Sequence, residues 1–322
     1  QKIGGIKREN RGKEYDVVVG LSGGIDSSYV AYLATQKYKL RVLGLHVDAG
    51  WNTEIAIHNI ERVVDNLGID LHTIIIDWNS MKEVQRAFLL SGVLCQDIPQ
   101  DHAFFASIYN FMLDNKIKYF LSGVNFMTEN ISPPGWGHPY MDAKHIKDIH
   151  AQYGRNRSIE KFPFFSLTDL IKNKQIKGLF DILKPLDVID YDKDAAKKIL
   201  ERLLGWKDYG DKHSESQFTI FYQNSYLPKK FKINKEEMHL SSLIVSNQIT
   251  RSQAIKALAK EKKYSDTVTN FVAKKLELDK EQLENCLVDP PSKHEDFKNS
   301  LRLYKFIAAV SSFIKTVQQA IN

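Results

Sequence analysis

The stretch YDVVVGLSGGIDSSY, residues 15–29, decides the fold. Its apolar first part predicts a buried strand over Tyr15–Leu21, and its serine- and glycine-rich second part predicts a turn that leads into a helix. Two adjacent glycines, Gly23 and Gly24, let successive backbone N–H groups point into one concavity, which the positive end of the helix also faces. The stretch therefore predicts an anion-binding loop between a strand and a helix.

The side chains of this loop suit the phosphates of a nucleotide. Ser22 and Ser27 would add hydroxyl donors, with Ser27 at the opening of the helix. Asp26 cannot favour a bare phosphate and is better explained as a ligand of the Mg²⁺ that accompanies one. The motifs G-x-x-x-x-G-K-[ST] and G-x-G-x-x-G are absent, so γ-phosphate transfer and dinucleotide binding lack their residues. The residues expected to bind the nucleotide are Leu21, Ser22, Gly23, Gly24, Asp26 and Ser27.

Short apolar runs alternate with amphipathic stretches through the first half of the chain. Apolar residues follow one another in these runs without alternating polar residues, so neither face of the strand would be exposed to solvent, and we expect buried strands. Strands that alternate with helices predict an α/β fold with a parallel sheet covered on both faces. The expected strands are Tyr15–Leu21, Arg41–Val47, His72–Asp77 and Tyr119–Ser122, and the expected helices are Ser27–Tyr38, Thr53–Leu67, Met81–Leu90 and His102–Asn115.

The pattern changes past Gly135. One more strand is expected at Lys184–Ile189, and only helical signals follow Met238. We therefore expect an α/β domain over residues 1–205, then a loop-rich bridge and a helical C-terminal unit over residues 206–322. The expected helices are Asp142–Gln152, Leu167–Lys172, Lys193–Leu204, Ser241–Ser246, Ser252–Glu261, Ser265–Lys275, Lys280–Cys286 and Asp296–Ala320.

The composition excludes several classes of protein. The net charge of +6 is a modest excess without a concentrated basic stripe, so a nucleic-acid partner is not expected. The longest apolar runs, such as Phe306–Val310, are far shorter than the ~20 residues that span a bilayer. The two cysteines, Cys95 and Cys286, lie far apart in sequence and have no C-x-x-C partner, so no disulfide framework is expected, which fits a cytoplasmic protein. Because the numbering starts at Gln1 and not at a methionine, we expect an upstream segment.

The phosphate loop and its flanks resemble the PP-loop ATP pyrophosphatases, the family of GMP synthetase, NAD synthetase, asparagine synthetase and tRNA-thiolating enzymes. The resemblance implies that an acceptor oxygen attacks the α-phosphorus of ATP to give an adenylate and pyrophosphate, after which a nucleophile displaces AMP. It implies that His46 and Val47 border the adenine. The segment SGVNFMTE looks like the family's later segment, in which Ser122 and Gly123 pack on the nucleotide and Glu129 joins Asp26 as a Mg²⁺ ligand. A carboxylate that stabilises a helix start is the alternative for Glu129.

A series of polar-rich loops narrows the resemblance. Their order and spacing resemble the N-acetyl sugar amidotransferases of bacterial surface-polysaccharide and flagellin glycan synthesis. The resemblance implies that the N-acetyl carbonyl oxygen of a free or nucleotide-activated sugar is adenylylated and that ammonia displaces AMP to leave an acetamidino group. The loops are Gln100–His102, Pro134–His138 with Asp142, Tyr209–Thr219, Tyr226–Phe231 and His239–Ile244.

Several residues of these loops are candidates for catalysis or substrate binding. Lys212 and His213, in a glycine-containing loop, would stabilise negative charge on the leaving pyrophosphate, and a solvated turn is the alternative. His102, at the head of a helix, would orient the substrate or act as an acid or base, and a capped surface histidine is the alternative. The substrate-binding candidates are Asn125, Trp136, His138 and Arg251, with a core position as the alternative for the tryptophan and an exposed helix start for the arginine.

Ammonia must come from outside this chain, because Cys95 has no nucleophile-elbow context and Cys286 lies in the helical tail. The resemblance points to a separate glutaminase paired with a cyclase-like barrel subunit related to those of histidine biosynthesis. Relatives often carry an N-terminal cysteine-rich segment that looks like a zinc site. This sequence has none, so no zinc is expected.

Two other functions share the phosphate loop. A tRNA-thiolating enzyme would need a persulfide-carrying cysteine near the α-phosphate, and Cys95 is the residue that would serve. A non-catalytic nucleotide sensor would bind ATP without turnover and would not need the polar loops of the second half.

Overall fold

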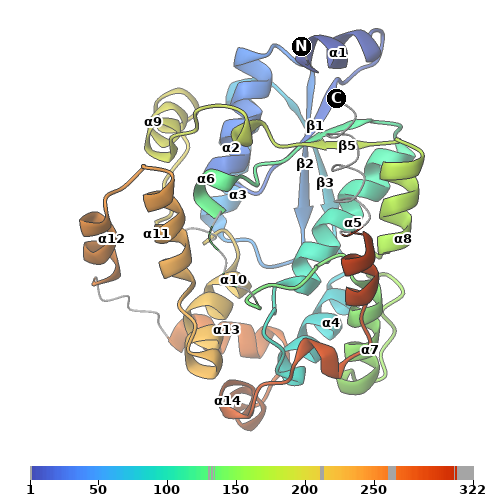
Figure 1. The fold of residues 1–322 in the computed structure, drawn as a ribbon, viewed down its shortest axis with the longest axis vertical. Coiled ribbons are helices and arrows are strands. Elements are labelled where there is room, and N and C mark those ends of the chain that lie inside the picture. Colours follow the sequence, from blue (N-terminus) through green and yellow to red (C-terminus); the bar gives the residue numbers. More distant parts are fainter. Residues whose placement is uncertain are drawn as a thin grey trace.

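The computed structural model describes residues 2–129, 131, 133, 135–210, 214–259, 266–307 and 309. At its centre is a five-stranded sheet in the order β3-β2-β1-β4-β5 (Figure 1). Every strand pairs in parallel with its neighbours, which confirms the predicted α/β fold with a parallel sheet. The strands are β1 (Val17–Gly20), β2 (Val42–Asp48), β3 (Asp70–Ile75), β4 (Tyr119–Leu121) and β5 (Asp181–Leu183).

Helices account for most of the remaining described residues. The α-helices are α1 (Lys2–Glu9), α2 (Ile25–Tyr32), α3 (Glu54–Leu67), α4 (Trp78–Ser91), α5 (Ile98–Asp114), α6 (Phe126–Glu129), α7 (Ala143–Tyr153), α8 (Leu167–Leu170), α9 (Lys193–Leu204), α10 (Gln217–Phe221), α11 (Lys235–Val245), α12 (Arg251–Leu258), α13 (Asp266–Lys275) and α14 (Lys280–Val288). The π-helices are η1 (Leu33–Lys37), η2 (Ile171–Ile176) and η4 (Tyr222–Phe231), and the 3₁₀ helices are η3 (Pro185–Asp187) and η5 (His294–Asp296). None of the helices described here is long and apolar enough to span a bilayer.

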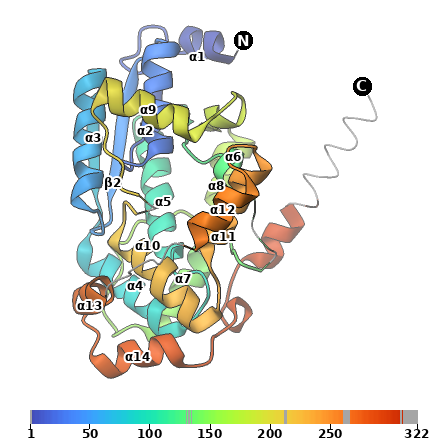
Figure 2. The same ribbon diagram turned by 90° about the vertical axis from the view of Figure 1, so that its left-hand side faces the viewer.

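Side chains that alternate along the central strand build a separate apolar core on each face of the sheet. Val17 and Val19 of β1 pack in the core covered by α2, α3 and α9, whereas Val18 packs in the core covered by α4, α5 and α7 (Figures 1 and 2). The second core continues into α10, η4, α13 and α14. The central strands are therefore buried on both faces, as parallel strands usually are. The domain boundary expected after residue 205 stays a prediction.

Two predictions about the sheet are wrong. The strand expected to be buried at His72–Asp77 corresponds to β3, which lies at the edge of the sheet and exposes most of its residues. The apolar Ile75, for example, keeps 78% of its surface exposed. The strand expected at Lys184–Ile189 is not a strand. β5 precedes it, and Pro185 begins the 3₁₀ helix η3, since proline has no N–H to donate to a strand ladder.

The bridge expected to be loop-rich contains consecutive helical turns, α10 and η4. Ser216 caps their start, because its Oγ accepts a hydrogen bond of 3.3 Å from the Thr219 N–H. Phe218, Tyr222 and Tyr226 recur every four residues on the buried side, a helical spacing that the polar residues between them obscured. The helix expected over Asp296–Ala320 also begins later, at residue 301, and residues 310–322 lie outside the described ranges.

Candidate active site

The phosphate loop, Leu21–Gly24, follows β1 at the carboxyl end of the sheet. β2 and β3 lie on one side of β1, and β4 and β5 lie on the other, so the order of the strands reverses at β1. Ligands of open parallel sheets bind at such a switch point. Gly23 has a φ of +80°, and a Cβ there would overlap the backbone carbonyl of Ala56. A Cβ at Gly123, in the turn after β4, would lie 2.8 Å from the Ser27 nitrogen. Glycine is therefore required on both sides of the switch point.

Hydrogen bonds hold the loop in a concave shape. The Ser22 N–H donates to Ser27 Oγ at 3.3 Å, and the two hydroxyl oxygens lie 3.1 Å apart. Ser27 Oγ also donates to the Gly24 carbonyl at 3.1 Å. The helix begins at Ile25, so Ser27 lies in its first turn and not at its opening as expected. From behind, the buried Trp206 indole donates to the Gly23 carbonyl at 2.9 Å. Hydroxyls and a helix start are thus gathered at one place, as an anion site requires.

His46 and Val47, the residues expected at the adenine, lie on β2 next to the loop and are largely buried. His46 Nδ1 lies 2.8 Å from the Leu21 carbonyl oxygen, and its Nε2 lies 3.0 Å from Asn52 Nδ2. Asn52 also donates to Asp48 Oδ1 at 3.0 Å. The histidine therefore fixes the first residue of the phosphate loop to β2. Its contact with adenine stays a prediction.

Asp26, on the first turn of α2, is held by side chains from two distant segments. The Tyr191 hydroxyl donates to Asp26 Oδ1, and the Thr128 hydroxyl shares its hydrogen between Asn125 Oδ1 at 3.2 Å and Asp26 Oδ2 at 3.5 Å. Tyr191 is 2% exposed, and its ring packs on Tyr29 with the ring centroids 5.7 Å apart. Burial, followed by the charge of Asp26, raises the pKa of Tyr191 well above its usual range, so the phenol remains a donor.

The carboxylates near the loop fit a magnesium ion. Thr128 links Asp26 to α6, whose last residue is Glu129, so both predicted ligands belong to one neighbourhood. Across the described ranges, no three histidine, cysteine or acidic residues gather as a complete metal site. Mg²⁺ typically takes one or two protein carboxylates and completes its shell with water and substrate phosphates. Asp26 fits that donor set, and Glu129 as its second ligand stays a prediction.

Glu215 is a residue of this site that the sequence did not single out. Its side chain lies over the phosphate loop, where a Cβ at Gly24 would overlap its Oε1. The Tyr209 hydroxyl donates to Oε1 at 2.6 Å, and the Thr53 N–H donates to the Glu215 carbonyl at 2.8 Å. Burial, followed by the charges of Glu215 and Asp26, raises the pKa of Tyr209 well above its usual range. The loop expected to contact the pyrophosphate is thus anchored on the phosphate loop.

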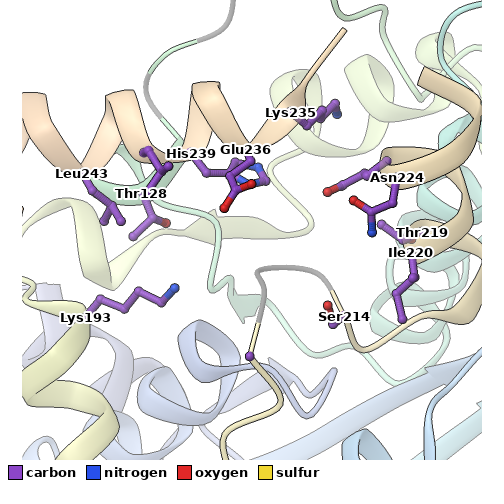
Figure 3. A pocket seen from close by; sticks show the side chains of 13 residues that line it. Thr128, Lys193, Ser214, Thr219, Ile220, Asn224, Lys235, Glu236, His239 and Leu243 are labelled. Carbon is purple, nitrogen blue, oxygen red and sulfur yellow. The ribbon is translucent and has the colours of Figure 1, made fainter. Parts of the chain in front are cut away.

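A cavity of about 130 Å³ opens beside Asp26, bounded by α6, the start of α9, α10 with η4, and α11 (Figure 3). Thr128 connects the two places, because it bonds Asp26 and also lines the cavity. Lys212 and His213, expected at the pyrophosphate, lie outside the described residues, but Gly210 and Ser214 on either side of that gap line the cavity. The other lining residues are Lys193, Thr219, Ile220, Gln223, Asn224, Lys235, Glu236, His239, Leu240 and Leu243.

The structure corrects the expectation for His102, which is fully buried and not at a helix surface. Its Nδ1 lies 2.9 Å from the Tyr140 carbonyl oxygen, and its Nε2 accepts a hydrogen bond of 3.3 Å from the Phe165 N–H. Burial lowers the pKa of His102 to about 4, so the ring is neutral at pH 7. Both ring nitrogens are engaged within the protein, and the residue supports the core.

The four residues expected to bind substrate do not line the cavity. Asn125 is 2% exposed and caps α6, because its Oδ1 accepts a hydrogen bond of 3.0 Å from the Thr128 N–H. Trp136 packs against the core, and the His138 ring stacks on His294 with centroids 4.0 Å apart. Arg251 is an exposed first residue of α12. Asn125 thus caps a helix, Trp136 and His138 pack against other side chains, and Arg251 is exposed to solvent.

Both cysteines are poor nucleophiles. Cys95 is 9% exposed, and burial raises its pKa to about 11. Burial raises the pKa of Cys286 to about 11 as well. A catalytic cysteine needs a lowered pKa and access to its substrate, so these surroundings argue against the tRNA-thiolating alternative.

Two protein families match different parts of the chain. Residues 7–91, which include the phosphate loop, match the NAD synthase family. Residues 215–311 match the family described as LPS biosynthesis protein WbpG-like, C-terminal domain. Residues 7–91 of the chain are thus similar to an NAD synthase, and residues 215–311 are similar to a WbpG-like C-terminal domain. Glu215 is the first residue of the WbpG-like match, and α10, η4 and α11 lie within it, so this domain supplies most of the cavity wall.

Two curated proteins match this chain over short segments. The identity is 41% over 83 residues with the NH(3)-dependent NAD(+) synthetase of Methanococcoides burtonii, and 38% over 73 residues with the glutamine-dependent NAD(+) synthetase of Aquifex aeolicus. These segments are 26% and 22% of this chain, and they span only 30% and 12% of the two relatives. A solved NMN synthetase from Francisella tularensis is 15% identical with a TM-score of 0.39, over 85% of this chain and 91% of that one.

Proposed function

We propose that this protein is an ATP-dependent amidotransferase that converts the N-acetyl group of a sugar into an acetamidino group during synthesis of a bacterial surface glycan such as lipopolysaccharide. The observation that carries the proposal is the shared position of Thr128, which bonds Asp26 of the phosphate loop and lines a cavity walled by the WbpG-like domain. An ATP site of the PP-loop kind and a separate acceptor site would thus meet at one residue.

ATP would bind with its terminal phosphates in the phosphate loop. The N–H groups at the start of α2 and the hydroxyls of Ser22 and Ser27 would be the donors for those oxygens, and the Ser27 hydroxyl would give up its bond to the Gly24 carbonyl to do so. Asp26 and Glu129 would hold Mg²⁺, which would neutralise charge on the pyrophosphate. Lys212 and His213 stay candidates for the same charge stabilisation, by position in the loop between Tyr209 and Glu215.

The reaction would proceed in two displacements. The N-acetyl carbonyl oxygen attacks the α-phosphorus, the bond from that phosphorus to the bridging oxygen breaks, and pyrophosphate leaves. The nitrogen of ammonia then attacks the activated carbon, loses protons to solvent, and AMP leaves with the former carbonyl oxygen. Adenylylation is needed because an amide oxygen is otherwise a poor leaving group.

The ammonia would come from another protein. Cys95 and Cys286, the two cysteines of the sequence, are buried and have a raised pKa, which does not suit the nucleophile of a glutaminase. We propose a separate glutaminase with a cyclase-like subunit as the supplier, in a cytoplasmic assembly without nucleic acid or membrane.

The test is incubation with ATP, Mg²⁺, ammonium and a panel of free and nucleotide-activated N-acetyl sugars. AMP and pyrophosphate should form only with a sugar acceptor, and Asp26→Asn should abolish their formation while thermal unfolding stays unchanged. Cys95→Ser should keep the activity, which a thiolating enzyme would lose. Unchanged ATP across the whole panel would contradict the proposal and favour a nucleotide sensor.

A further inference from the structure

Glu215 brings a carboxylate to the phosphate loop, and the proposed chemical steps give it no role. A Cβ at Gly24 would overlap Glu215 Oε1 and would lie 3.2 Å from Ser22 Oγ. The carboxylate therefore lies on the same face of the loop as a hydroxyl donor. Helix α2 begins directly after Gly24, so this face also meets the positive end of a helix, where a phosphate is favoured.

Side-chain contacts fix the carboxylate in this place. The Tyr209 hydroxyl donates to Glu215 Oε1 at 2.6 Å. The Tyr209 ring packs edge-on against Trp206, with the ring centroids 5.6 Å apart, and the Trp206 indole donates to the Gly23 carbonyl at 2.9 Å. The residue that holds Glu215 is thus anchored on the phosphate loop itself.

The backbone around Glu215 is bonded to the segment that follows β2. The Thr53 N–H donates to the Glu215 carbonyl at 2.8 Å, and Thr53 Oγ1 donates to the Ser214 carbonyl at 3.4 Å. The Gln217 N–H donates to the Trp51 carbonyl at 2.8 Å. Because these bonds lie on both sides of Glu215, its carboxylate has little freedom to leave the loop when a ligand arrives.

A carboxylate fixed at an anion-binding loop affects which form of ATP the loop accepts. The start of α2 attracts the carboxylate and a phosphate alike, but the two negative groups repel each other at close range. A divalent cation offsets that repulsion, because carboxylate and phosphate oxygens are ligands that Mg²⁺ takes together. Without the cation, Glu215 would oppose the binding of ATP.

We propose that Glu215 determines the form of ATP that the loop binds, because it disfavours metal-free ATP and favours the magnesium complex. The inference rests on the ATP site of the proposed function and adds a residue that decides the specificity of that site. A carboxylate that served only to stabilise the start of α2 would have the same effect on both forms of ATP.

The test measures ATP binding by equilibrium dialysis without an acceptor sugar, once in excess Mg²⁺ and once in EDTA. The measured quantity is the dissociation constant in EDTA divided by that in Mg²⁺. Glu215→Gln removes the charge and keeps an oxygen that can accept from Tyr209. The matched control is Glu54→Gln, because Glu54 is an exposed carboxylate that follows Thr53 in the chain. Thermal unfolding of each variant checks that it is folded.

We expect Glu215→Gln to bind metal-free ATP about tenfold more tightly than wild type and the magnesium complex about tenfold more weakly. The ratio of dissociation constants then falls about 100-fold, whereas the control keeps the wild-type ratio. A wild-type ratio in Glu215→Gln would overturn the proposal. So would a change of equal size and direction in both conditions, since the side chain would then only support or obstruct the loop.

Tyr209→Phe decides the question if Glu215→Gln does not fold. The substitution removes the hydroxyl that holds the carboxylate at the loop and keeps the ring that packs on Trp206. The ratio should then fall about tenfold, because a hydrogen bond to a charged group is lost while the charge itself remains. In that case a folded Tyr209→Phe protein with the wild-type ratio would overturn the proposal.

AMP formation with N-acetyl sugars separates this inference from the proposed function. A ratio that falls in Glu215→Gln, while wild type forms no AMP from any sugar, would uphold the role of Glu215 and contradict the amidotransferase. AMP formed by a wild-type protein whose Glu215→Gln variant keeps the wild-type ratio would uphold the reaction and overturn the role of Glu215. A wild-type protein that binds neither form of ATP would overturn both.

Discussion

Tyr191→Phe should weaken the binding of Mg²⁺ without unfolding the protein. The substitution removes the hydroxyl that donates to Asp26 Oδ1 and keeps the ring that packs on Tyr29. A hydrogen bond to a charged group contributes about 1.5–3 kcal/mol, and the partial exposure of Asp26 places the expected loss toward the lower end. Residues that orient metal ligands typically change metal affinity by about 10- to 100-fold when replaced. We expect an increase of about tenfold in the Mg²⁺ concentration that gives half-maximal AMP formation.

The assay is a Mg²⁺ titration of AMP formation at saturating ATP and acceptor, accompanied by thermal unfolding. The matched control is Tyr32→Phe, because Tyr32 also packs on Tyr29, with ring centroids 5.9 Å apart, but does not bond Asp26. The control should titrate like wild type. If Tyr191→Phe has the wild-type midpoint and the wild-type unfolding temperature, the reasoning that Tyr191 orients a metal ligand is refuted.

Two further predictions concern the phosphate loop and the buried histidines. Gly23→Ala should abolish ATP binding in equilibrium dialysis. A left-handed backbone costs alanine about 1–2 kcal/mol, and the alanine Cβ would also overlap Ala56. ATP binding at wild-type strength would contradict the loop geometry. Burial lowers the pKa of His145 to about 3 and that of His294 to about 4, whereas a histidine of the unfolded chain has a pKa of about 6.5. The unfolded state therefore binds more protons below pH 6.5, and the stability of the folded protein falls as the pH drops from about 6.5 toward 4. His145→Phe should reduce that fall in unfolding temperature, whereas the same change at exposed His58 should not; equal slopes in both variants would contradict the assignment.

The sequence predicted the parts of the fold that depend on neighbouring residues. The strand, loop and helix around Ser22 follow from local patterns, and the structure has them in the expected order, with the helix beginning two residues earlier than expected, at Ile25. The exposure of β3 depends on its position at the sheet edge, and no pattern within His72–Asp77 contains that information. The helical turns of α10 were missed because polar residues interrupt their apolar stripe.

The candidate site was predictable only in part, for the same reason. Asp26 is found from its place in the loop, but its partners Tyr191 and Thr128 lie 165 and 102 residues away in sequence. His102 seemed available as a polar residue at a helix start, and only the tertiary structure brings Tyr140 and Phe165 onto its two nitrogens. Contacts between residues so far apart in sequence depend on the tertiary fold, and a local sequence pattern carries no information about them.

The most direct test of the proposed amidotransferase uses isotopically labelled ammonium with ATP, Mg²⁺ and an N-acetyl sugar, followed by mass spectrometry of the sugar. The account predicts AMP in equal amount to a product in which labelled nitrogen has replaced the acetyl oxygen. Formation of ADP, or release of AMP without a labelled sugar, would contradict it.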